Sequence, residues 1–96
     1  MSEPAPQVYT ATLDPEALEA LFVDLALTRV LEVRAKGAPT SRSAELGLSQ
    51  AQTLLQSGEI RALQVCYIWK DETWIDTLFA SPAGTRLTRT RAPAGT

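Results

Sequence analysis

The stretch Ile60–Ser81, IRALQVCYIWKDETWIDTLFAS, decides the fold of this chain. Apolar and polar residues alternate on both sides of a short polar break at Lys70, Asp71 and Glu72, which is the pattern of two β-strands joined by a tight turn. The stretch holds both tryptophans, one of the two tyrosines and the only cysteine. We therefore expect a β-hairpin that carries much of the aromatic content of the chain.

The length of the turn sets the register of this hairpin. An even loop, either Asp71-Glu72 or Lys70 to Thr73, would place Trp69 directly opposite Trp74 as a cross-strand aromatic pair. A three-residue loop would shift the pairing by one residue and separate the two indoles onto different faces. With the even loop, the face that holds both tryptophans also collects Leu63, Val65, Tyr67, Asp76 and Leu78.

Three elements are expected ahead of the hairpin. Val8–Leu13 alternates and has β-branched residues, which predicts a short strand. The pair Asp14-Pro15 predicts a helix start, because a carboxylate caps the first turn and proline suits the first helical position. That helix should run to about Leu27. Arg29–Lys36 alternates again and predicts a half-buried strand, with Val30 on its charged face.

The remaining elements are predicted from turn residues and composition. Residues 37–47 are small and polar, which predicts a loop. Ser49 with Gln52 three residues later fits a capping box, and Gly58 is placed to end the resulting two-turn helix. Thr85–Arg91 predicts a last strand; it contains a single apolar residue and three arginines, so we expect it at the edge of the sheet.

The expected order is therefore β-α-β-α-β-β-β, an α+β class. We expect a two-layer domain with a mostly antiparallel sheet of four to five strands and two helices on one face. The 96-residue length allows one domain, which we place at residues 8–91. Residues 1–7 and 92–96 are rich in small residues and proline and are expected to be disordered tails.

Composition argues against most chemistry. The chain has no histidine and one cysteine, so the commonest general base and a structural zinc site are both excluded. Cys66 is the one candidate nucleophile, but a mid-strand position without a basic neighbour fits a small core residue better. We expect no enzyme activity, no cofactor and no metal. The lack of an apparent secretory signal or membrane-spanning run predicts a cytoplasmic protein.

These patterns favour a small interaction, assembly or accessory protein. It would bind another protein, or a second copy of itself, through the aromatic face of the hairpin and the sheet edge, because tyrosine and tryptophan are enriched where proteins meet. The partner-binding residues expected are Tyr67, Trp69, Trp74 and Asp76. The competing interpretation is that this face is simply the core, with the tryptophans beneath the helices.

A nucleic-acid-binding module is the alternative function, and a small enzyme is the last one considered. In the nucleic-acid hypothesis, phosphates would contact Arg86, Arg89 and Arg91 on the C-terminal strand. The net charge of −2 opposes this hypothesis, because nucleic-acid-binding domains usually carry a basic surface.

Overall fold

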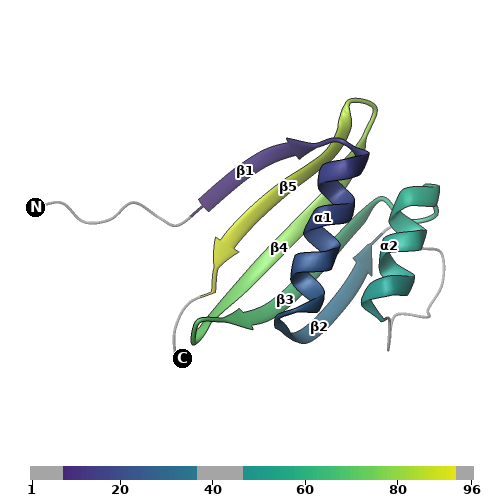
Figure 1. Cartoon of the computed structure of the whole chain (residues 1–96). Coiled ribbons are helices and arrows are strands. Elements are labelled where there is room, and N and C mark those ends of the chain that lie inside the picture. The colour runs from purple at the N-terminus through teal and green to yellow at the C-terminus, as the bar shows by residue number, and fades with distance from the viewer. Residues whose placement is uncertain (1–7, 37–46, 93–96) are drawn as a thin grey trace, which may run out of the picture.

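The computed structural model describes residues 8–36 and 47–92, and within them the predicted α+β order is confirmed (Figure 1). The expected tails, apart from Ala92, and the expected loop, apart from Gly47, lie outside the described residues. Seven elements follow one another: β1 (Val8–Leu13), α1 (Pro15–Ala26), β2 (Arg29–Lys36), α2 (Leu48–Ser57), β3 (Ala62–Trp69), β4 (Glu72–Ser81) and β5 (Gly84–Arg91). The strands form one sheet in the order β1-β5-β4-β3-β2, and every neighbouring pair is antiparallel.

Both helices lie on the same side of the sheet (Figure 1). Their buried residues join those of the central strands in a single apolar cluster: Leu18, Leu21, Phe22 and Leu25 from α1, Ala51 and Leu55 from α2, and Leu63, Val65, Tyr67, Leu78 and Leu87 from the sheet. A buried leucine or phenylalanine contributes roughly 1.5–3 kcal/mol through the apolar surface that it removes from water. This cluster therefore holds the helices to the sheet. Separately, neither described helix has the length and apolar content needed to cross a membrane.

The helix ends show which local signals were correct. Asp14 caps α1 as predicted, because its side-chain oxygen accepts a hydrogen bond of 2.8 Å from the N–H of Ala17. For α2 the predicted capping box at Ser49 is wrong: the helix begins at Leu48, and Gly47 is the N-cap without a side-chain bond. Gly58 ends α2 in the left-handed conformation, with φ of 83°, as predicted.

The hairpin has the predicted faces but not the predicted register. Its loop is the two residues Lys70 and Asp71, whose φ angles of 54° and 64° are those of a type I′ turn. Trp69 therefore pairs with Glu72, and Trp74 pairs with Tyr67. Because the shift from the predicted pairing is two residues, every side chain keeps its predicted face, and the two indoles become diagonal instead of opposite neighbours.

Two predictions about β2 and β5 are wrong. A β-bulge between Val30 and Glu32 in β2 turns Val30 to the helix side, opposite Tyr67, and leaves Leu31 half exposed. The strand β5 is not at an edge, because it pairs with β1 on one side and β4 on the other. Its polar character has another cause: Arg89 is paired with Asp76 on the helix face, and Thr88 and Thr90 lie on the face without helices.

Candidate functional site

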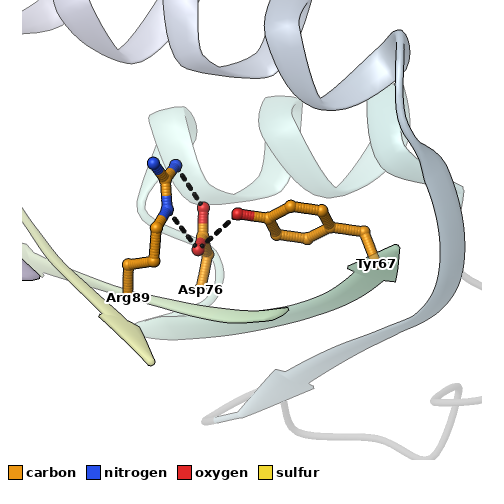
Figure 2. Close-up of polar contacts among 3 residues, drawn as sticks. All are labelled: Tyr67, Asp76 and Arg89. Carbon is orange, nitrogen blue, oxygen red and sulfur yellow. Dashed lines mark hydrogen bonds and ion pairs between the residues drawn. The ribbon is translucent and has the colours of Figure 1, made fainter. Parts of the chain in front are cut away.

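A polar cluster lies within the apolar helix face of the sheet (Figure 2). The carboxylate of Asp76 on β4 accepts two hydrogen bonds of 2.9 Å from Arg89 on β5, one from Nε to Oδ1 and one from Nη2 to Oδ2. The hydroxyl of Tyr67 on β3 donates a third bond of 3.0 Å to Oδ1. Three adjacent strands thus each contribute one side chain, and both oxygens of the carboxylate are bonded.

Burial determines the electrostatics of this cluster. Asp76 is fully buried, whereas the Arg89 side chain is 32% exposed and leads toward solvent. Burial raises the pKa of Tyr67, and the negative charge of Asp76 raises it further. The hydrogen bond with Asp76 raises the pKa of Arg89. Near neutral pH, Tyr67 therefore stays protonated and Arg89 stays positively charged. The cluster is a bidentate ion pair between Arg89 and Asp76, with a further hydrogen bond from Tyr67.

The four predicted partner-binding residues divide into a buried and an exposed set. Tyr67 and Asp76 have 4% and 0% of their surface exposed, so neither offers a contact surface to a partner. Trp74 packs against the core, and its indole Nε1 is buried without an acceptor among the described residues. Trp69 is 50% exposed, so it is the one of these four residues that offers a large exposed aromatic surface.

Trp69 lies at the end of the β3–β4 hairpin, where charged residues surround it. The Nζ atom of Lys70 is 4.6 Å from the centre of the ring system, within the range of a cation–π contact. Opposite Trp69 on β4 is Glu72, whose carboxylate pairs with Arg91 at 3.1 Å. The exposed indole thus has the Lys70 cation over its ring system and the Glu72–Arg91 ion pair on the opposite strand.

The three arginines proposed for nucleic acid do not share a surface. Arg86 lies on the sheet face opposite the helices, as does Phe79, its cross-strand neighbour. Arg89 and Arg91 are on the helix face, and their guanidinium groups are paired with Asp76 and Glu72. Two of the three charges are thus already balanced by a carboxylate, and the third points the other way.

Ionisable groups that could support catalysis are dispersed. Cys66 lies on the face without helices; its burial raises the pKa of the thiol, and Glu32 on β2 raises it further. A thiol with a raised pKa is a poor nucleophile at neutral pH. Within the described part of the chain, no three histidine, cysteine or acidic side chains are grouped to hold a metal ion.

A groove of about 450 Å³ lies between the start of α1, the end of α2 and the β4–β5 turn. Its lining includes Leu13, Leu18, Leu55 and Thr85 and has no ionisable side chain among the described residues. A groove of this composition can accept an apolar group, but it holds no acid, base or nucleophile for a reaction.

Sequence reasoning missed the pairing of Asp76 with Arg89. It placed Asp76 on a partner surface and Arg89 on a phosphate-binding one, because both conclusions assumed that charged residues face solvent. One signal was available: each charge occupies an inward position of its alternating strand, two residues from Leu78 and Leu87. Two opposite charges on inward positions of neighbouring strands indicate a buried ion pair.

Comparisons of the chain with protein-family models, with curated proteins and with solved structures found no match.

Proposed function

We propose that this protein is a non-catalytic interaction module that binds another protein through the Trp69 end of the β3–β4 hairpin. The observation that supports it most is the half-exposed indole of Trp69 beside the ion pair of Glu72 with Arg91. Tryptophan and arginine are the residues most enriched among the few that dominate binding energy at protein interfaces.

The hairpin end is anchored close to this indole. Trp74, its diagonal neighbour, packs on the core, and Tyr67 beside Trp74 is bonded to Asp76. Side chains that are already ordered before binding lose less conformational entropy on association, so the same contacts give a higher affinity. The tight turn also orders the hairpin end, because the loop contains two residues, Lys70 and Asp71.

A protein partner fits this surface better than a nucleic acid does. Arg91 beside Trp69 is already paired with Glu72, so a phosphate would have to displace a carboxylate to reach it. Lys70 is the nearest other cation, and it lies over the indole face on which a base would stack. An apolar side chain of a protein partner does not need to displace the Glu72 carboxylate from Arg91.

The test compares two aromatic residues of equal exposure on opposite faces of the sheet. Trp69 is 50% exposed on the helix face, and Phe79 is 49% exposed on the other. Wild type, Trp69→Ala and Phe79→Ala would each be used as bait in nuclease-treated lysate of the source cells, and a captured protein would be purified and titrated against all three by calorimetry. We expect Trp69→Ala to weaken binding by about 30-fold or more, and Phe79→Ala to leave it within about threefold.

Thermal melts of the free proteins provide the control for folding. Since Trp69 is half exposed, its loss should lower the free energy of unfolding by about 1 kcal/mol or less. Equal affinity of wild type and Trp69→Ala for the purified partner would defeat the proposal. Recovery of nucleic acid, in place of a protein, from untreated lysate would defeat it as well.

A further inference from the structure

The two edges of the sheet differ in how well they are protected. The edge strand β2 carries the charged residues Arg29, Glu32, Arg34 and Lys36 and is interrupted by a β-bulge. These are two of the devices by which proteins prevent a strand from being added to an exposed edge. The other edge strand, β1, has six residues with no charge, no proline and an uninterrupted register against β5. No described element lies beyond it (Figure 1).

The backbone groups that β1 leaves unpaired follow from the hydrogen-bond alternation across the sheet. The N–H of Ala80 on β4 donates to the carbonyl of Arg61, on the β3 side, at 3.0 Å. The carbonyl of Thr73 accepts from the N–H of Ala92, on the β5 side, at 2.9 Å. Because backbone groups in an antiparallel ladder alternate in direction, even-numbered residues of β4 face β3 and odd-numbered residues face β5.

The registers of β4 with β5 and of β5 with β1 then give the direction of each backbone group in β1. The odd-numbered residues of β4 pair with even-numbered residues of β5, so the odd-numbered residues of β5 face β1. Their partners are Tyr9, Ala11 and Leu13, which therefore bond to β5. The residues whose N–H and C=O groups point away from the sheet are Val8, Thr10 and Thr12.

We infer that β1 pairs in antiparallel fashion with β1 of a second copy of this chain, across a two-fold axis at Thr10. In this register Thr10 faces Thr10 of the second copy, and Val8 faces Thr12 in both directions. All three outward residues of each copy then exchange both backbone hydrogen bonds, and the two sheets become one. A register displaced by two residues would leave one of the three unpaired on each copy.

The side chains at the proposed junction are compatible with this pairing. Tyr9, which is 56% exposed, falls opposite Ala11 of the second copy, so a large ring meets a small neighbour on the helix face. Thr10 and Thr12 are exposed on the other face and meet residues that are also uncharged. Each copy thus covers one of the most exposed aromatic residues of the other.

The strand β1 is complementary to a second copy of itself. It carries no charged residue, so no like charges face each other when two copies pair. The two-fold axis pairs all three outward residues of each copy and brings Tyr9 of each copy against Ala11 of the other. This self-complementary register favours a second copy over an unrelated strand.

The experiment introduces charge at the axis. In Thr10→Lys and in Thr10→Glu, the new charge faces the same charge at position 10 of the second copy. Each variant alone should therefore sediment as a monomer at concentrations where wild type is a dimer. An equimolar mixture of the two should recover the dimer, because the charges are then opposite. The same substitutions at Thr53, an exposed residue of α2, are the matched control and should leave the dimer unchanged.

Two further measurements keep the inference falsifiable. Thr10→Pro removes an N–H that points away from β5, which an edge strand tolerates, so it should also yield a folded monomer. In wild type, amide exchange at Thr10 and Thr12 should slow with rising protein concentration, while exchange at Tyr9 and Ala11 stays slow throughout. A wild-type monomer at all concentrations, a dimer that survives both charged variants, or a dimer in which Thr10 and Thr12 exchange freely would overturn the inference. Neither Trp69 nor its hairpin enters this argument, so either proposal can fail alone.

Discussion

Asp76 is a fully buried carboxylate, and the other buried residues that the structure describes are hydrophobic. An ionised carboxylate without partners in such a place would cost several kcal/mol. Arg89 and Tyr67 offset this cost by bonding both oxygens. Arg89 comes from β5 and Tyr67 from β3. The cluster therefore also disfavours a shift in the register of either strand against β4, because the Asp76 carboxylate would then lose a partner.

At the residue scale, the raised pKa of Tyr67 predicts a loss of stability at alkaline pH. Below about pH 10, the usual pKa of tyrosine, the residue is protonated in the folded and the unfolded chain, so it adds no pH dependence. Above that pH the unfolded chain releases the proton and the folded chain retains it. The free energy of unfolding should then fall by up to about 1.4 kcal/mol per pH unit until the folded pKa is reached.

Urea unfolding from about pH 8 to about pH 11, compared between wild type and Tyr67→Phe, measures this effect. Both proteins would carry Cys66→Ser, because the pKa of that thiol is raised as well. At pH 8, Tyr67→Phe should be less stable by about 1–3 kcal/mol, the cost of a hydrogen bond to a charged group. Its alkaline slope should be shallower than that of wild type, and equal slopes would contradict the assignment to Tyr67.

At the scale of elements, the sequence predicted what depends on periodicity and end signals. The bounds of β1 and β2, the Asp14 cap and the faces of the hairpin were all correct. What failed depends on contacts between elements. Alternation cannot reveal that a bulge turns Val30 toward the helix side of the sheet. Composition cannot reveal that the last strand, β5, pairs with the first strand, β1.

The hairpin turn was missed for a related reason, and it leads to a prediction. A type I′ turn favours asparagine and glycine, whereas here Lys70 and Asp71 adopt left-handed φ angles of 54° and 64°. The left-handed conformation costs a residue with a Cβ about 1–2 kcal/mol, and glycine avoids that cost but loses more entropy on folding. Asp71→Gly should therefore raise the free energy of unfolding by about 0.5–1 kcal/mol in urea unfolding.

A second variant at this position separates backbone strain from charge. Asp71→Ala removes the carboxylate but keeps the Cβ, so its stability should stay close to that of wild type. If Asp71→Ala gained as much as Asp71→Gly, the effect would come from the lost charge and not from the turn.

At the scale of the whole molecule, the two edges determine how far assembly can proceed. Pairing at β1 across a two-fold axis uses the same strand on both copies, so it closes at the dimer. The resulting sheet ends in β2 on both sides. By the same alternation, only Val33 and Ala35 present outward backbone groups in the part of β2 that is C-terminal to the bulge. The exposed Arg34 and Lys36 lie beside them. The dimer should therefore have no further site of strand addition.

This protection predicts the result of removing it. In the double variant Arg34→Thr, Lys36→Thr, the exposed edge keeps its bulge but loses the cations that disfavour pairing. We expect species larger than a dimer in sedimentation velocity, in a proportion that grows with protein concentration. Adding Thr10→Lys should reduce their size, because it breaks the β1 junction and leaves only contacts through β2. A double variant that remains a dimer at every concentration would show that the bulge, and not the charge, protects this edge.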